Sequence, residues 1–363
     1  MRAVVTRPGE GRAWLAELDE PVVQAPDDVL VDMVRVGVCG TDRHVMARGF
    51  GPRQLPAGSD VLVLGHEAVG RVNSVGRDVR HLRPGDLVVP TVRRGCGSCP
   101  TCTADQADLC FTGAYRERGI VGLHGFLSER IVEREADLVA VPSELAAVAP
   151  LVESLTTPEK ALRRIGNARA HLPLDGELHG VRRALVTGSG PIALLAVMAL
   201  RLRDVETVDL ARQPIDGPAA RIVQDVGATY VPLAEVEMDR PQERLGEFDA
   251  VVEATGAIEM AVPMIAVLAR NGVLDLAGGG SGPTVSVDPR LFGSMVGRNL
   301  TIVGSVNANA DDWRAAVRDL IAMRTRFGDA VDRLITHTFT FDDVDVAFER
   351  VPGQIKAVFD ISA

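Results

Sequence analysis

Short runs in which apolar and polar residues mostly alternate fill the first part of the chain. Residues 29–36 read Val-Leu-Val-Asp-Met-Val-Arg-Val, and shorter apolar runs at 3–5, 61–64 and 87–89 lie between turns that contain Gly or Pro. A period of two is typical of strands that are buried on one face, and frequent turns favour antiparallel pairing. We therefore predict a barrel-like β domain in this part of the chain.

The pattern changes after residue 180. An apolar strand at residues 183–187 precedes Gly188-Ser189-Gly190-Pro191-Ile192-Ala193, and a continuous apolar helix follows at 194–202. Gly-x-Gly-x-x-Ala between a strand and a helix is a dinucleotide-binding fingerprint, in which the pyrophosphate rests on the helix N-terminus. Alternating strands and helices predict a parallel sheet, and its further strands are expected at 207–210, 248–253, 272–277 and 301–306.

Four more predictions concern the join between these regions and the C-terminal part of the chain. Residues 167–180 are polar, contain Pro and Gly, and are interpreted as a linker or exposed loop. Pro158 follows Thr157 and is predicted to be the first residue of a helix. A helix is expected at about 311–326 and a closing strand at 356–361.

Composition narrows the class of protein. The 363 residues, 46% of them hydrophobic, can bury two cores. The net charge of −10 comes from 49 acidic and 39 basic residues without a basic run, which argues against nucleic acid or an anionic membrane as partner. Because the N-terminus lacks a signal peptide's apolar segment and the chain lacks a stretch of about 18 apolar residues, we expect a cytoplasmic protein.

Four of the five cysteines form the most specific motif, Cys96-x-x-Cys99-x-x-Cys102-x7-Cys110. Four thiolates at this spacing suit a closed tetrahedral zinc site, which orders a lobe too small to have its own core. The alternative is an iron–sulfur cluster. A ferredoxin motif would place the fourth cysteine closer and follow it with Pro, whereas Phe111 follows here. A site with four cysteine ligands has no open position, so this zinc is expected to be structural.

A second candidate metal site begins with His66 and Glu67, which lie in Leu64-Gly65-His66-Glu67. Imidazole and carboxylate suit a borderline-soft ion, and Cys39 upstream and Glu153 downstream can supply further ligands. Two alternatives remain: a surface ion pair for His66 and Glu67, and a buried, inert thiol for Cys39.

Two polar segments indicate binding. The second strand of the parallel sheet ends at Ala211-Arg212-Gln213, without the acidic residue typical of NAD specificity, so NADP is favoured unless Arg212 is only a solvated surface charge. In the loop at 115–129, Glu117 and His124 could face a sugar or a cation, although a solvated loop would also fit.

In order along the chain, Cys39, Gly65-His66-Glu67, the four-cysteine lobe, Glu153 and Gly188-x-Gly190 resemble the zinc-containing medium-chain alcohol dehydrogenases. Residues 88–94, 115–126 and 153–161 are most similar to the glucose 1-dehydrogenase branch of that family. The resemblance implies an α/β protein with two domains. A GroES-like β-barrel catalytic domain would cover 1–157, with 309–363 returning to it, and a Rossmann dinucleotide-binding domain would cover 158–308.

The resemblance also implies roles for individual residues. Cys39, His66, Glu67 and Glu153 would hold a catalytic zinc, with Glu67 and water exchanging, in addition to the structural zinc at Cys96, Cys99, Cys102 and Cys110. Thr41 would take the substrate proton and pass it outward to His44. Substrate contacts would come from Thr41, Glu117, Glu153, Thr157 and Asn307. Cofactor contacts would come from Gly188, Ser189, Gly190, Pro191, Ile192, Ala211, Arg212, Gln213, Thr255, Ala277, Gly278, Gly279, Ser305, Val306, Asn307 and Lys356.

The chain departs from the branch pattern at three positions. Ser154 stands where Pro commonly follows the acid, Gln213 replaces a second basic residue, and Ala193 replaces the third glycine, which the fingerprint tolerates. Gln213 weakens the argument for strict use of NADP, and Ser154 with Thr157 bears on the identity of the sugar.

We therefore expect a zinc-dependent oxidoreductase that oxidises a sugar hydroxyl, converting an aldose to its lactone with NADP or NAD, as a homodimer or homotetramer. One alternative is a dehydrogenase of another polyol, an aminocyclitol or an amino alcohol. An alternative of a different class is a non-catalytic zinc protein that binds partners through its cysteine lobe.

Overall fold

The computed structural model describes residues 1–49, 51, 54–280 and 282–362. The chain divides into two compact units. The first contains Met1–Glu153, Asn307–Val317 and Leu334–Ala363, and the second contains Ser154–Val306 and Arg318–Arg333. Helices α3 (Leu151–Arg169) and α9 (Ala310–Phe327) each have residues in both units. In the described part of the chain, no helix is both long and apolar enough to cross a membrane.

The first unit is built from mainly antiparallel sheets. Its largest sheet has the order β11 (Leu138–Val141), β6 (Leu87–Pro90), β5 (Glu67–Val75), β3 (Asp28–Val38), β19 (Lys356–Asp360) and β18 (Ile335–Phe339), with β10 (Arg130–Arg134) also paired to β3. One smaller sheet contains β2 (Ala13–Glu17), β1 (Arg2–Thr6) and β4 (Leu62–Val63). The other contains β7 (Arg93–Arg94), β8 (Arg116–Arg118) and β9 (Gly122–Leu123). Among the described strands of these sheets, only the β18–β19 and β8–β9 pairs are parallel. The short helices of the first unit are α1 (Gly40–Ala47), α2 (Pro100–Thr103) and α10 (Val344–Ala347). Its 3₁₀ turns are η1 (Ala107–Leu109), η2 (Glu135–Asp137), η3 (Ser143–Leu145) and η7 (Phe341–Asp343).

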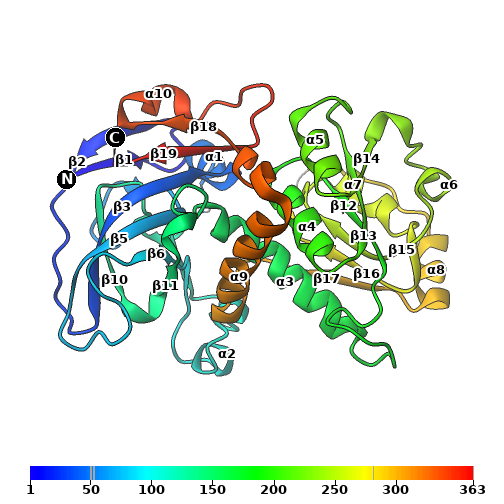
Figure 1. Cartoon of the computed structure of the whole chain (residues 1–363), viewed down its shortest axis with the longest axis horizontal. Coiled ribbons are helices and arrows are strands. Elements are labelled where there is room, and N and C mark those ends of the chain that lie inside the picture. Colours follow the sequence, from blue (N-terminus) through cyan, green and yellow to red (C-terminus); the bar gives the residue numbers. More distant parts are fainter. Residues whose placement is uncertain (50, 52–53, 281, 363) are drawn as a thin grey trace. The chain divides into compact units, whose positions relative to one another are not determined.

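Strand β3 organises the core of this unit. Its residues Val29, Val31 and Met33 are buried and belong to one apolar cluster, as the alternation in the sequence predicted. The closing strand β19 pairs antiparallel with β3, with Ala357 opposite Val38, so both ends of the chain contribute to one sheet (Figure 1). This arrangement confirms a β-barrel-type unit.

The second unit holds a six-stranded parallel sheet. Its order is β14 (Thr229–Pro232), β13 (Glu206–Ala211), β12 (Arg183–Thr187), β15 (Phe248–Glu253), β16 (Leu268–Leu276) and β17 (Thr301–Gly304). This is the strand order of a Rossmann domain, with the crossover between β12 and β15. The other elements are α4 (Pro191–Leu202), α5 (Pro218–Asp225), α6 (Pro241–Leu245), α7 (Ile258–Met264), α8 (Arg290–Arg298) and the 3₁₀ turns η4 (Leu233–Glu235), η5 (Gly328–Ala330) and η6 (Asp332–Leu334).

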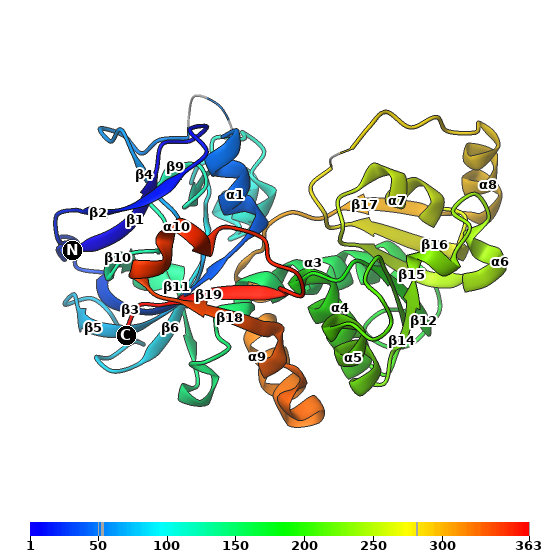
Figure 2. The same ribbon diagram turned by 90° about the horizontal axis from the view of Figure 1, so that it is seen from above.

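Consecutive residues of β12 and β13 are buried, which means that both faces of the sheet are covered. Helices α4 and α5 lie side by side against β12, β13 and β14 (Figure 2), and α7 and α8 contact β16. Residues 194–200 of α4 are all buried. The apolar run that predicted this helix is therefore explained by packing around its whole circumference.

One helix boundary was predicted wrongly. Pro158 lies inside α3 and does not begin it. Leu151, Leu155 and Leu162 recur at helical spacing and are at most 1% exposed, so their burial carries the helix through a residue that cannot donate a backbone hydrogen bond.

The unit boundaries also differ from the predicted domains. Residues 318–333 belong to the second unit, whereas the sequence assigned all of 309–363 to the first, and 154–157 belong to the second as well. Both differences arise because α9 and α3 are continuous helices that leave one unit and enter the other.

Candidate metal centres and cofactor site

Cys39 is positioned by the junction of β3 and α1. It is the N-cap of α1, and Asp42 in the first turn accepts a hydrogen bond of 2.8 Å from the Cys39 backbone N–H. This reciprocal capping fixes the backbone at Cys39 and leaves the thiol half-buried. Thr41 lies in the same turn, with its Oγ1 3.7 Å from Cys39 Sγ.

His66 is held by the same aspartate. Its Nδ1 lies 3.4 Å from Asp42 Oδ1, and both side chains are buried. Burial alone would lower the pKa of His66, but the charges of Asp42 and Cys39 raise it well above its ordinary value. Asp42 also accepts the Gly65 N–H at 3.2 Å. Gly65 adopts φ +85°, and a Cβ there would lie 2.7 Å from Val36, so the turn into His66 requires glycine.

The ligand atoms of Cys39, His66 and Glu67 all lie within 4.8 Å of one another. Sulfur, nitrogen and oxygen donors at this spacing fit a zinc ion with a position left for substrate or water. The interpretation of His66 and Glu67 as a surface ion pair is wrong, because both are buried and His66 faces Asp42.

Glu153 lies in the first turn of α3, near this group. Burial raises its pKa to about 7, the charge of His66 opposes that shift, and the charge of Glu67 adds to it. Its carboxyl is thus close enough to interact electrostatically with both residues, but it is not among the three whose donor atoms lie within 4.8 Å.

Lys356 lies against one of the candidate metal ligands. Its Nζ lies 2.6 Å from both carboxylate oxygens of Glu67, and each side chain is 2% exposed. This ion pair lies beside the candidate metal ligands, and the cofactor contact predicted for Lys356 stays a prediction. An ion held by Cys39 and His66 would share Glu67 with this ammonium group.

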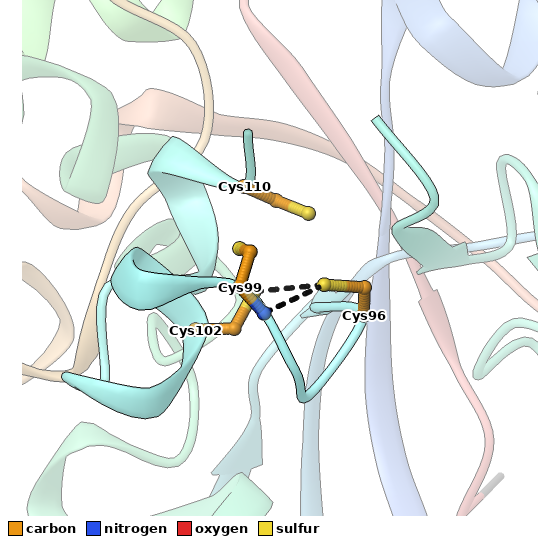
Figure 3. Close-up of side chains that lie close together, drawn as sticks. All are labelled: Cys96, Cys99, Cys102 and Cys110. Carbon is orange, nitrogen blue, oxygen red and sulfur yellow. Dashed lines mark hydrogen bonds between the residues drawn. The ribbon is translucent and has the colours of Figure 1, made fainter. Parts of the chain in front are cut away.

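The four-cysteine lobe has the geometry of a second metal site. The sulfur atoms of Cys96, Cys99, Cys102 and Cys110 lie within 4.8 Å of one another and face a common centre (Figure 3). Cys96 Sγ and Cys102 Sγ are 3.8 Å apart, which is the separation expected of two ligands at about 2.3 Å from a tetrahedral zinc.

The environment of these thiols also favours a cation. Hydrogen bonds, first from Thr112, lower the pKa of Cys96 to about 5, whereas burial raises that of Cys102 to about 11. All four can be thiolates together only with a positive charge between them. A Cβ at Gly95 would lie 2.4 Å from Cys102 Sγ, so only glycine fits beside the lobe.

Apart from Lys356, the predicted cofactor residues lie at or just after the carboxyl ends of the parallel strands. Gly188, at φ +120°, follows β12, and Gly190 is the N-cap of α4, with Pro191 and Ile192 in its first turn. Gly190 is exposed, and no heavy atom lies within 4 Å of the Cβ position there. The backbone can therefore approach a pyrophosphate closely.

The neighbouring strand ends meet at this edge. Glu253 of β15 accepts hydrogen bonds from the backbone N–H of Thr255 at 2.8 Å and of Gly256 at 3.1 Å, and its own carbonyl accepts those of Ala277 and Gly278. Glu253 therefore ties the end of β15 to that of β16, and sequence reasoning did not single it out.

The other strand ends of the parallel sheet differ in the groups that could contact a cofactor. Arg212 is 72% exposed, with its Nη2 3.6 Å from Glu259, and the adjacent Ala211 is buried. The Ser305 hydroxyl donates to Asp275 at 2.6 Å inside the unit, so towards a cofactor this hydroxyl could only accept a hydrogen bond. Val306 is 64% exposed, and its carbonyl accepts a hydrogen bond from Lys160. The remaining predicted contacts at this edge are Ser189, Gln213 and Gly279.

The predicted sugar residues Glu117 and Asn307 lie together although they are far apart in sequence. Asn307 Nδ2 donates to Glu117 Oε1 at 2.8 Å. Arg93 donates to the same oxygen, which the sequence did not reveal. His124 Nδ1 accepts a hydrogen bond of 3.2 Å from the Val63 N–H, which gives this histidine a structural role. Thr157 is half-buried in α3 and belongs to the second unit.

Comparison with known proteins decides the family. A model described as the alcohol dehydrogenase GroES-like domain matches residues 25–143, and one described as the glucose dehydrogenase C-terminus matches 146–361. The glucose 1-dehydrogenase of Methanocella arvoryzae is 34% identical, with both chains fully covered. The enzyme of that name from Thermoproteus tenax is 37% identical over 99% of each chain.

The chain belongs to the glucose dehydrogenase branch of the zinc-containing medium-chain alcohol dehydrogenases. It is thus an NAD(P)-dependent zinc oxidoreductase.

Solved structures agree with this membership. Haloferax mediterranei glucose dehydrogenase, in complex with NADP, Zn and gluconolactone, superposes with a TM-score of 0.90 at 32% identity, and both chains are fully covered. Escherichia coli galactitol-1-phosphate dehydrogenase, 22% identical with a TM-score of 0.81 and 99% of this chain covered, shares the fold.

Proposed function

We propose that this chain oxidises an aldose at its anomeric carbon to the lactone. The observation that carries this proposal is the full-length similarity, at 32% identity, to a dehydrogenase whose structure holds NADP, Zn and gluconolactone. In the balanced reaction, the sugar loses a hydride from carbon and a proton from oxygen, and NAD(P)⁺ becomes NAD(P)H.

Cys39, His66 and Glu67 would hold the catalytic zinc, with Glu153 as an additional carboxylate ligand. When bound, the ion supplies Lewis-acid polarisation of the sugar hydroxyl, and the nicotinamide accepts the hydride. Asp42 orients the imidazole of His66, and Lys356 partly neutralises Glu67. With the four-cysteine site, the chain would bind two zinc ions.

A proton path leads outward along α1. Thr41 lies beside Cys39 and would accept the proton from the sugar hydroxyl while passing its own outward. His44 is exposed on the same helix and would deliver the proton to solvent. Glu117 and Asn307 would bind other sugar hydroxyls, and the substrate contact expected of Thr157 stays a prediction.

Cofactor choice would depend on Arg212. Its exposed guanidinium follows β13, where a ribose 2′-phosphate is bound in proteins of this fold, and its ion pair with Glu259 is long. Both features favour NADP. Gln213 is neutral and adds no second positive charge for a 2′-phosphate, so use of NAD stays compatible with this strand end.

A substrate panel tests the proposal. Glucose, galactose, xylose, inositol and threonine would each be supplied with NADP⁺ or NAD⁺, and reduced cofactor would be measured at 340 nm. We expect the highest kcat/KM with an aldose and NADP⁺, and lactone as the product. Faster oxidation of a cyclitol or an amino alcohol would contradict the choice of substrate.

We also propose a homo-oligomer. β17 is an edge strand of the parallel sheet, and Ile302 on it is 38% exposed. In α8, Phe292 and Val296 are 61% and 80% exposed. An open strand edge with exposed apolar side chains favours association with a second copy.

We place the protein in the cytoplasm, because the cysteine lobe must stay reduced to bind zinc.

A further inference from the structure

Arg93 and Glu117 form a cross-strand pair. β7 and β8 are antiparallel, and their register places Arg93 directly opposite Glu117. Arg93 Nε and Nη2 lie 3.0 and 2.8 Å from Glu117 Oε1. The two side chains are only 5% and 11% exposed, so solvent screens this charge-assisted contact weakly.

The guanidinium is itself anchored to the cysteine lobe. Its Nη1 donates to the carbonyl of Asp108 at 2.9 Å, and Asp108 lies in η1, two residues before Cys110. The ring of Tyr115 stacks on the guanidinium, with its centroid 3.8 Å from Arg93 Cζ. Arg93 therefore cannot turn away from Glu117 without breaking contacts to the lobe.

These contacts orient the Glu117 carboxylate. In the described part of the chain, every hydrogen bond of its side chain ends on Oε1, which accepts Arg93 twice and Asn307 once. Oε2 is not among the buried atoms that lack a partner, and the side chain keeps some exposure. Oε2 is thus the oxygen left to accept a hydrogen bond from a ligand.

We infer that Arg93 is a positioning residue for the sugar: it fixes Glu117 so that Oε2 accepts a substrate hydroxyl, and it anchors that carboxylate to the cysteine lobe. This inference rests on the proposed function. An acceptor held in this way selects neutral polyhydroxylated substrates, because a phosphate or carboxylate at the same place would face Glu117 without a hydrogen to donate.

The test compares Arg93→Lys and Arg93→Met with wild type. Lysine keeps a positive charge but not the forked geometry, and methionine keeps neither. We expect KM for the aldose to rise about tenfold in Arg93→Met and by less in Arg93→Lys, while KM for NADP stays within twofold. A merely structural role would lower the active fraction, and hence apparent kcat, without this order of KM values.

Arg94 offers a matched control. It lies on the same strand, pairs with Glu133 at 2.9 Å and Asp137 at 3.0 Å, and is not bonded to Glu117. Arg94→Lys should leave KM for the aldose unchanged. If Arg93→Met does not fold, Arg93→Lys decides the question: a rise of threefold or more supports the inference, and an unchanged KM overturns it. A wild-type protein that oxidises no aldose would instead refute the proposed function.

Discussion

Asp209 is a carboxyl of the second unit whose surroundings are apolar and offer neither of its oxygens a hydrogen bond among the described residues. It lies in β13 and is fully buried. Burial raises its pKa well above the ordinary value. Burial also raises the pKa of Tyr230 to about 12, and the charge of Asp209 adds to that shift. A buried, unpaired carboxyl opposes folding whenever it is ionised.

Replacing Asp209 should therefore stabilise the protein. The unfolded chain releases this proton near pH 4 and the folded chain at higher pH, so the carboxyl lowers stability progressively as pH rises between the two values. Asp209→Val should raise the free energy of unfolding at pH 8 by ~1–3 kcal/mol, and by less at pH 5. Thermal unfolding at both pH values measures the difference.

Asp216→Val is the matched control, since Asp216 is exposed on the loop after the same strand and should change stability by less than ~0.5 kcal/mol. A loss of stability in Asp209→Val at pH 8 would show that the carboxylate has a favourable partner in solution.

Residue chemistry was more predictable from the sequence than residue pairing. The types and spacing of Cys39, His66 and Glu67 indicated a metal site before any fold was known, because few other uses suit them. The contact between Lys356 and Glu67 could not be foreseen, since the two residues are 289 positions apart. Asp42 left a weak signal: it is the third residue after an N-cap.

The cysteine lobe is an element whose order should depend on its metal. α2 has four residues and η1 three, with no large apolar side chain fully buried between them. Cys102→Ser should lower the zinc content from two ions per chain to one and decrease the free energy of unfolding by about 4 kcal/mol or more. Metal analysis and thermal unfolding measure both effects.

Ser98→Ala is the control for that substitution. The Ser98 hydroxyl is 3.6 Å from Cys96 Sγ but is not a zinc ligand in the proposed site, so both ions should remain. Full zinc content and unchanged stability in Cys102→Ser would mean that the lobe does not need the metal.

Elements were predicted well where burial follows a regular period. β12, β13 and α4 agree closely with the apolar runs that indicated them. The helix start predicted at Pro158 was wrong because tertiary packing can override local residue preference. In α3, burial of the leucines stabilises the helix on both sides of Pro158.

For the whole molecule, the sequence indicated a barrel-type unit and a Rossmann unit, but not where continuous helices leave one and enter the other. Local patterns show that α9 is a helix, whereas its assignment to two units depends on contacts with distant residues.

Association is a property of the assembled molecule that can be tested at the sheet edge. Ile302→Lys places a charge on β17 and should shift the mass in solution from a multiple of the chain to a single chain, as measured by light scattering. Val22→Lys, at an apolar residue that is 61% exposed in the first unit, should leave the mass unchanged. A monomeric wild type would contradict the proposed oligomer.

The central claim is that Cys39, His66 and Glu67 would hold the zinc ion that the oxidation of an aldose by NAD(P)⁺ requires. Its most direct test is Cys39→Ser, with zinc per chain and the rate of NADP⁺ reduction by glucose measured on the same preparation. Wild type should hold two zinc ions and turn over, while the variant should hold one and lose at least ~10³-fold in kcat/KM, about 4 kcal/mol of transition-state stabilisation. Wild-type turnover in a variant that holds one zinc ion would contradict the account.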